Sequence, residues 1–250
     1  MTTQQPEPKI RSAVYELLSL AFLYPKEGAS TQLLHGAREM GDAIAVTDGS
    51  PLAGPLDTLC GELQSCDDAG LENQYIEVFG HTLSTDCSPY ESEYGQAHVF
   101  QKTHTLADLS TFYQAFGVSL NPELKDRLDH ISVEMEFMHL LTLKEAYARG
   151  NGHGEDKALL CLQAQETFLA NHLGTWIKRF ADRVARKTGG FGVYGVLAGL
   201  LDAYMDAEFL RFRLDPETSS RSQPMEPPED DLGCNPFTAD AGGRQGVTAR

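Results

Sequence analysis

One stretch of the chain carries acidic and histidine side chains at helical spacing. Within residues 128–147, His130 and Glu134 are four positions apart, so they meet on one side of a helix. Asp129 stands directly before them. A histidine and a carboxylate at this spacing could transfer a proton as an acid–base pair. The same spacing also suits a hydrogen-bonded structural pair, so it does not by itself predict catalysis.

A second pattern in the same stretch could bind metal. Glu136 and His139 form a Glu-x-x-His, which di-iron carboxylate bundles place on two of their four inward-facing helices. The chain has no second copy of this motif, and its five cysteines include no C-x-x-C pair. The sequence therefore predicts no metal, no cofactor and no enzymatic activity, with a di-metal carboxylate helical-bundle enzyme as the alternative.

A glycine-rich run also resembles a binding motif. Residues 190–195 read Gly-Phe-Gly-Val-Tyr-Gly, which matches G-x-G-x-x-G. The dinucleotide-binding version of this motif follows a β-strand. Here a long helical pattern precedes it, so the run predicts a turn between two helices in which glycine allows close packing.

The helix that positions these residues must be packed on two sides. Its apolar residues fall on opposite faces, with Ile131, Met135 and Met138 on one and Val133, Phe137 and Leu140 on the other. A surface helix has one apolar stripe and one wet face. The sequence therefore predicts a central helix, which we expect to begin near Pro122.

Helical periodicity recurs along most of the chain. It predicts helices over residues 10–24, 30–46, 52–63, 71–79, 105–116, 156–187 with a break near 172–174, and 193–212. Thr105 is a candidate cap, and residues 81–94 are predicted to form an ordered loop. The fold class is all-α: a single globular bundle of about eight or nine helices over residues 1–214. Residues 215–250 are rich in Pro, Ser, Gly and acid, and predict a disordered tail.

Composition restricts the class of partner. The chain has 250 residues, with 20 Lys and Arg against 36 Asp and Glu, and a net charge of −16. Such a surface repels nucleic acid and anionic lipid and favours basic partners. No segment approaches the roughly 20 apolar residues that cross a bilayer. We therefore expect a cytoplasmic protein that binds no nucleic acid and has no integral membrane segment.

Three motifs occur in a fixed order along the chain, and together they resemble those of a known protein family. They are Tyr75-Ile-Glu-Val-Phe-Gly80, Cys87-Ser-Pro-Tyr-Glu-Ser-Glu-Tyr-Gly95 and Asp129-His-Ile-Ser-Val-Glu-Met-Glu-Phe-Met138. Together with the opening residues 15–25, they resemble the TorD/DmsD/NarJ family of molybdoenzyme maturation chaperones over roughly residues 10–212. The resemblance implies an all-helical, non-catalytic cytoplasmic protein. Its partners would be the apo form of the catalytic subunit of a DMSO-reductase-type molybdenum enzyme, held until molybdopterin is inserted, and commonly that subunit's twin-arginine signal peptide. The sequence is compatible with a monomer or a homodimer.

The resemblance also implies a site. The family's Asp-His pair, implicated in peptide recognition, matches Asp129 and His130. Its aromatic positions match Tyr75 and Phe79, and its loop motif matches Tyr90, Glu91 and Tyr94. Many relatives carry an acidic-Pro pair shortly before Asp-His, where this chain reads Asp126-Arg-Leu128. Acidic seams beside aromatic residues suit a basic, apolar peptide, because carboxylates pair with guanidinium groups. The predicted client-binding residues, which we expect to wall a groove at the start of the central helix, are Asp129, His130, Glu134, Tyr75, Phe79, Tyr90, Glu91 and Tyr94.

Overall fold

The computed structural model describes residues 8–45, 50–80, 86–94, 99–118, 127–151 and 155–215. The α-helices within these ranges are α1 (Pro8–Ala21), α2 (Ala29–Ala45), α3 (Ala53–Gln64), α4 (Asp68–Phe79), α5 (Val99–Ala115), α6 (Ile131–Gly150), α7 (Glu155–Asn171), α8 (Leu173–Thr188) and α9 (Gly192–Phe212). A short 3₁₀ turn, η1 (Glu91–Glu93), lies between α4 and α5. The described ranges contain no β-strand, so the all-α prediction is confirmed.

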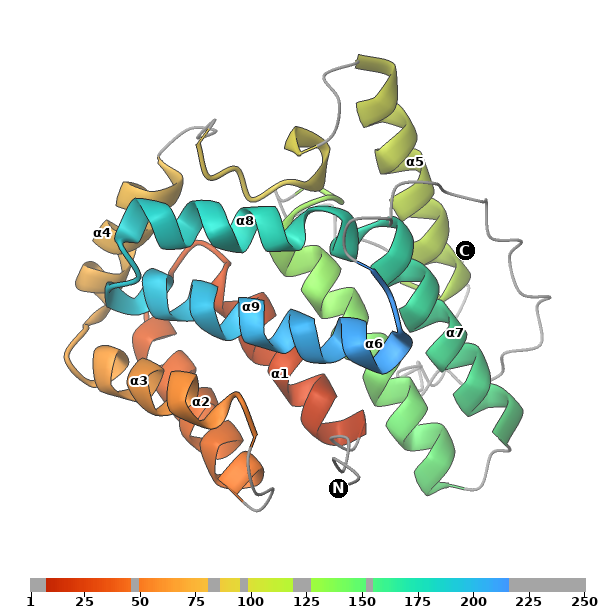
Figure 1. Cartoon of the computed structure of the whole chain (residues 1–250), viewed down its shortest axis with the longest axis horizontal. Coiled ribbons are helices and arrows are strands. Elements are labelled where there is room, and N and C mark those ends of the chain that lie inside the picture. The colour runs from red at the N-terminus through yellow and green to blue at the C-terminus, as the bar shows by residue number, and fades with distance from the viewer. Residues whose placement is uncertain are drawn as a thin grey trace, which may run out of the picture.

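Helix α6 is packed on both sides, as its two apolar faces predict. It lies against α1 on one side and α7 on the other, while α8 and α9 pair with each other across the bundle (Figure 1). Met135 and Met138 are fully buried, and the ring of Phe137 lies 4.8 Å from that of Phe168 in α7. The central helix of the sequence is therefore also central in space.

The boundaries of several helices follow from local sequence. The side chain of Asp67 accepts a hydrogen bond from the backbone N–H of Gly70, which caps the start of α4. Gly189 ends α8 in the left-handed conformation that glycine adopts without strain. The predicted break near residues 172–174 is confirmed, because α7 ends at Asn171 and α8 begins at Leu173.

Two predicted starts are wrong. The central helix begins at Ile131, and residues 127–130 are not helical, whereas the sequence predicts a start near Pro122, which lies outside the described residues. Residues 127–130 form a turn, in which the N–H of His130 donates to the carbonyl of Arg127 at 3.0 Å, and the backbone of residues 89–91 bonds to residues 129–131. Helix α5 begins at Val99, six residues before the Thr105 that we predict as its cap.

The glycine-rich run at 190–195 lies where two helices join, as predicted: α8 ends at Thr188, and α9 begins at Gly192 within the run. Gly190 and Gly192 have positive φ angles of 79° and 70°, which residues with a side chain rarely adopt. A Cβ on Gly195 would lie 2.5 Å from the carbonyl carbon of Gly190 and 2.8 Å from Oγ1 of Thr188. The motif therefore lets α8 and α9 meet closely.

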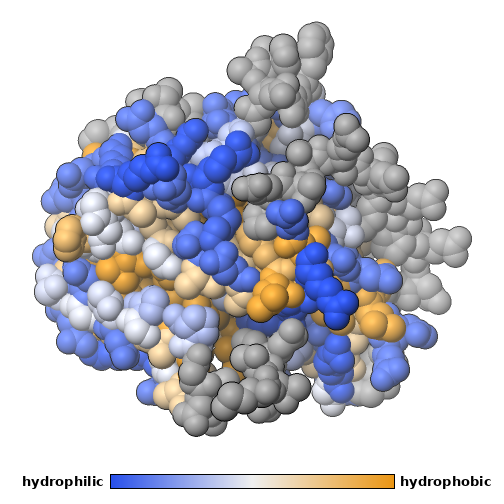
Figure 2. Space-filling model, viewed as in Figure 1, coloured by the Kyte–Doolittle hydropathy of each residue, from blue (hydrophilic) through white to orange (hydrophobic). Residues whose placement is uncertain are grey.

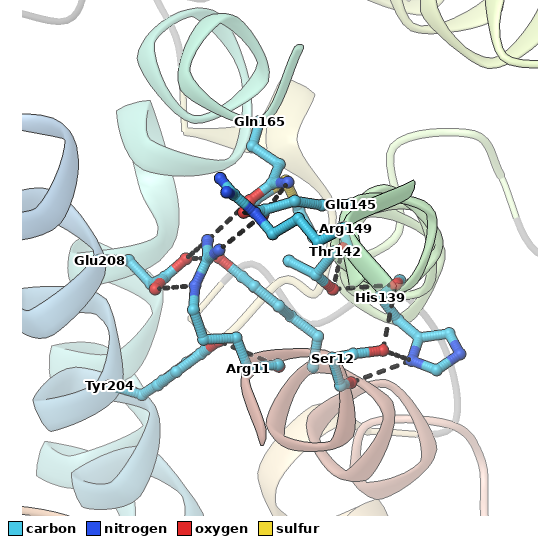
Figure 3. Close-up of polar contacts among 11 residues, drawn as sticks. Arg11, Ser12, His139, Thr142, Glu145, Arg149, Gln165, Tyr204 and Glu208 are labelled. Carbon is cyan, nitrogen blue, oxygen red and sulfur yellow. Dashed lines mark hydrogen bonds and ion pairs between the residues drawn. The ribbon is translucent and has the colours of Figure 1, made fainter. Parts of the chain in front are cut away.

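A buried ion-pair network joins α1 to α6, α7 and α9. Arg11 is 1% exposed, and its Nε donates to Oε1 of Glu208 at 2.7 Å while Nη2 donates to Oε1 of Gln165 at 2.7 Å (Figure 3). Its Nη1 lies 3.3 Å from Oε2 of Glu145. Burial alone would lower the pKa of Arg11, but the hydrogen bond and charge of Glu208 raise it, so the guanidinium stays charged. These contacts fix the relative positions of four helices.

The predicted tail, residues 215–250, lies outside the described residues except for Asp215. The same holds for residues 81–85 of the predicted loop. Within the described part of the chain, no helix combines the length and hydrophobicity that crossing a lipid bilayer requires.

Candidate functional site

Two of the three sequence motifs, the one that begins at Cys87 and the one that begins at Asp129, meet at one place in the structure. The loop of residues 86–94 lies antiparallel to the segment that leads into α6, with a bridge between Tyr90 and His130. Ile131 donates its N–H to the carbonyl of Pro89 at 2.8 Å, and Glu91 donates its N–H to the carbonyl of Asp129 at 2.9 Å. Backbone bonds across about forty residues of sequence thus hold the loop at the start of α6. We call residues 86–94 with residues 127–134 the junction.

Asp129 is fully buried in the junction and is paired with an arginine. Nε and Nη2 of Arg127 donate to its two carboxylate oxygens at 2.9 and 2.6 Å. The N–H of Ser92 donates to Oδ2 at 3.2 Å, and Nη2 of Arg127 also donates to Oγ of Ser92 at 2.8 Å. The guanidinium lies 4.2 Å from the ring centroid of Tyr90. Asp129 therefore holds a guanidinium by a bidentate hydrogen bond, the strong form of this pair.

His130 caps the central helix. Its Nδ1 accepts a hydrogen bond from the N–H of Ser132 at 3.2 Å and lies 2.6 Å from Oγ of the same residue. The ring is buried and packs edge-on against Tyr90, with 5.1 Å between centroids. Because Nδ1 accepts from the backbone, His130 satisfies one of the donors that a helix start leaves unpaired. The predicted pairing of His130 with Glu134 along one helix face is wrong, since His130 precedes the helix.

Glu134 points instead into a buried acidic group. It is 0% exposed, and its Oε2 accepts a hydrogen bond from Nε1 of Trp176 at 3.2 Å. Burial raises the pKa of Glu134 well above its ordinary value, and the nearby charge of Glu91 raises it further. Burial therefore favours the neutral, protonated form of Glu134 over the charged form.

Glu91 has a different partner. Both of its carboxylate oxygens lie 3.3 Å from Nδ1 of His172, the residue between α7 and α8. Burial raises the pKa of Glu91, and the hydrogen bond with His172 acts in the opposite direction. The 3₁₀ turn that carries Glu91 is therefore tied to the α7–α8 break as well as to α6.

The predicted aromatic residues lie in the core. Tyr75 and Phe79 of α4 are 8% and 4% exposed, and Phe79 stacks on Phe180 of α8 at 6.0 Å. Tyr94 is 4% exposed, and its ring lies 5.2 Å from that of Trp176. The structure thus does not bring Tyr75, Phe79 and Tyr94 to an open surface. Tyr90 is the predicted aromatic residue that is partly exposed.

Several partners of the predicted site residues were not predicted from the sequence. Arg127, Ser92, His172 and Trp176 each bond to a predicted site residue, and none of them was selected as a site residue from the sequence. His172 and Trp176 are four positions apart, which could have suggested a shared face. Their acidic partners are 81 and 42 residues away, so spacing alone could not identify them.

Glu136 and His139, the residues of the Glu-x-x-His motif, do not contact the buried acids of the junction. Glu136 is exposed, and Nδ1 of His139 lies 2.9 Å from the carbonyl oxygen of Ser12 and 3.0 Å from its Oγ (Figure 3). Throughout the described ranges, no group of three or more His, Cys, Asp or Glu side chains is arranged to hold a metal ion.

Known proteins share this sequence pattern. The family model described as nitrate reductase delta subunit matches residues 48–182, more than half of the chain. The chain belongs to this family, which includes TorD and NarJ. The matched residues contain the whole junction. The resemblance drawn from the three motifs is therefore confirmed.

Individual relatives agree with the family. The chaperone protein TorD of Vibrio parahaemolyticus is 24% identical over 207 residues, covering 80% of this chain and 94% of the relative. A chlorate reductase assembly chaperone protein of Ideonella dechloratans is 31% identical over 137 residues, covering 52% and 66%. The crystal structure of a "putative redox enzyme maturation protein" from Archaeoglobus fulgidus has a TM-score of 0.50 and 21% identity, covering 78% of this chain and 93% of that one. This last similarity shows the fold.

Proposed function

We propose that the protein is a cytoplasmic chaperone that assists assembly of a molybdenum enzyme. It binds the apo form of the catalytic subunit, and its twin-arginine signal peptide, until the cofactor is inserted, and it catalyses no reaction itself. Membership of the nitrate reductase delta subunit family carries this proposal. Relatives named as TorD and as chlorate reductase assembly chaperones support the chaperone role.

The chemistry of the junction supports recognition of arginine. Asp129 accepts two hydrogen bonds from a guanidinium whose face lies over Tyr90, and Glu93 lies 3.8 Å from the same group. Arg127 already occupies the fork-shaped acceptor of the buried Asp129, so an arginine of a bound segment would meet the aromatic face of Tyr90 and the negative charge of Glu93. The net charge of −16 would add long-range attraction for a basic segment.

Within this proposal the predicted residues have two roles. Tyr90, which is partly exposed, and the neighbouring Glu93 contact the client directly. The buried residues shape the surface that the client meets: Asp129 and His130 fix the start of α6, Glu91 holds the loop at the α7–α8 break, and Glu134 bonds α6 to α8. Tyr75, Phe79 and Tyr94 support α4 and the loop from the core.

Co-purification tests the function. The full chain, tagged and expressed in its native cells, should enrich the catalytic subunit of a molybdenum enzyme, identified by mass spectrometry. Enrichment should be higher when molybdenum cofactor synthesis is blocked, because the apo subunit then accumulates. Recovery of no molybdenum enzyme under either condition would refute the proposal.

Paired variants test the site. Tyr90→Ala and Glu93→Gln should weaken binding of a twin-arginine signal peptide by about 1 kcal/mol each, in line with a lost cation–π contact or ion pair at a wet surface. Glu166→Gln, which removes one exposed charge on α7, is the matched control. Equal effects of Glu93→Gln and Glu166→Gln on titration calorimetry would mean that only net charge matters.

A further inference from the structure

Helix α8 differs from the rest of the molecule in charge. It carries five basic residues and one acidic residue, in a chain whose net charge is −16. Its buried face is apolar, so the charges gather on the outer face, where Figure 2 shows strongly hydrophilic side chains over α8. The outer face of α8 is therefore a local basic surface on an acidic protein.

Three of these bases form a line along the helix. Arg179, Arg183 and Lys187 are spaced four residues apart, so they fall close to one stripe that spans about 12 Å along the axis. Arg179 and Lys187 are exposed, and Arg183 is partly exposed. We call these three residues the basic stripe.

The bases of the stripe differ from the other two bases of α8 in their ion pairs within the described residues. Lys178 pairs with Asp202 and Asp206 of α9, and Arg186 pairs with Asp182. By contrast, no carboxylate of the described residues lies within 4.0 Å of a nitrogen of the basic stripe; Arg179 bonds only to the carbonyl of Thr175 in its own helix. Three neighbouring positive charges repel one another, and a chain with 36 acidic residues has ample means to pair them.

Structural roles account for part of the stripe. Nζ of Lys187 donates to the carbonyl of Val78 at 2.9 Å, which satisfies an acceptor near the end of α4. The guanidinium of Arg183 lies 4.5 Å from the ring centroid of Tyr94. Neither contact pairs the base with a carboxylate, and Arg179 has no comparable structural role. The contacts do fix Arg183 and Lys187 in place, so less side-chain entropy would be lost on binding.

We propose that the basic stripe is a docking surface for a short acidic segment of the partner protein. The stripe is extended and lies on a convex helix face, so it fits successive carboxylates of a polypeptide better than one compact anion. Nucleic acid and anionic lipid extend far beyond the stripe, so they would meet the acidic remainder of the surface and be repelled, whereas a short acidic segment would contact the stripe alone. The inference rests on the proposed function only for the identity of the partner. The junction of the proposed chaperone attracts basic segments. The basic stripe adds a second contact of opposite charge beside it.

Two matched double variants of the full chain test the proposal. Arg179→Gln/Arg183→Gln removes two charges of the stripe, and Lys178→Gln/Arg186→Gln removes two charges of the same helix that are already paired. The probe is a fluorescein-labelled peptide of alternating Glu and Ala, with alternating Gln and Ala as control. Anisotropy should show binding of the acidic peptide only, weakened about fivefold by the stripe variant and less than twofold by the control variant. Arg179→Gln alone, whose side chain supports no other element, should weaken it about twofold.

Five results would overturn the inference. Equal weakening by both double variants would mean that only net charge matters, and equal binding of both peptides would exclude a charge-based site. Displacement of the peptide by equimolar inorganic phosphate would identify a phosphate site. Dissociation of a dimer by the stripe variant, seen by sedimentation, would identify a second copy as the occupant. If the stripe variant still co-purifies with its client as wild type does, the inference fails while the proposed function stands.

Discussion

Arg127 and Asp129 form a bidentate ion pair although only one residue separates them, and the pair has one buried and one partly exposed end. The side chain of Asp129 is 0% exposed and that of Arg127 is 28% exposed. This contact is possible because residues 127–130 are not helical; in a helix, positions two apart point to different sides. Residues 127–130 form a turn instead, and the loop of residues 86–94 bonds to the backbone of Asp129 and Ile131 and holds this turn in place.

Removing the arginine should destabilise the fold. Arg127→Gln leaves the buried carboxylate of Asp129 without its counter-charge, and we expect a loss of about 3 kcal/mol in the free energy of unfolding. The double variant Arg127→Gln/Asp129→Asn removes both charges and should recover more than half of that loss. Urea unfolding followed by circular dichroism measures both. A loss below about 0.5 kcal/mol in the single variant would show that the pair is not coupled to folding.

The cap at the start of α6 gives a second prediction. His130→Ala removes the side-chain acceptor for the N–H of Ser132 and should reduce stability by about 1 kcal/mol. His130→Asn restores a good capping acceptor and should lose less. Thermal denaturation of the two variants, compared at equal pH, tests this order. If both substitutions lose the same stability, packing of the imidazole against Tyr90 is the dominant contribution.

The buried acid Glu134 makes stability depend on pH. Its pKa is raised in the folded protein, so above the ordinary value of 4.5 the folded state retains a proton that the unfolded chain has released. Stability therefore falls as pH rises from about 5, by at most about 1.4 kcal/mol per pH unit for one proton. Glu134→Gln keeps an acceptor for Trp176 without a titrating proton. Its unfolding free energy should be higher than that of wild type at pH 8 and should vary less between pH 5 and 8.

The control for this prediction lies on the same helix. Glu136 is exposed, so Glu136→Gln should leave the pH dependence of unfolding as in wild type. Parallel pH profiles for wild type and Glu134→Gln would contradict a protonated Glu134 and would assign any pH dependence to other groups.

Two glycines of α9 should respond in opposite directions. A Cβ on Gly195 would meet Gly190 at 2.5 Å and Thr188 at 2.8 Å, so Gly195→Ala should cost about 1–3 kcal/mol through overpacking. Gly199 has no atom within 4 Å of its Cβ position, so Gly199→Ala should gain about 0.5–1 kcal/mol from helix propensity. Thermal unfolding of the two variants measures the difference. Equal shifts would show that α8 and α9 separate without cost at this turn.

Local sequence by itself determined most of the helices of this protein. Apolar residues repeat with the period of a helix because one or two faces must be buried, and this pattern located α2, α3, α7, α8 and α9 within a residue or two. The break at His172 and the glycine-rich turn between α8 and α9 are also local, since a few backbone angles end one helix and start the next. The ordered motifs determined the family for the same reason: they are short strings of adjacent residues.

Only the tertiary structure decided where α6 begins and which charges are buried. His130 is a cap and not a helical residue because Tyr90, forty positions earlier, bonds beside it. Arg11 reads as an ordinary polar residue of α1, yet its partner Glu208 is 197 positions away. Periodicity reports which face of an element is buried, but it carries no information on which distant side chain will lie opposite. Pairing, burial of charge and the resulting pKa shifts arise only when the helices pack.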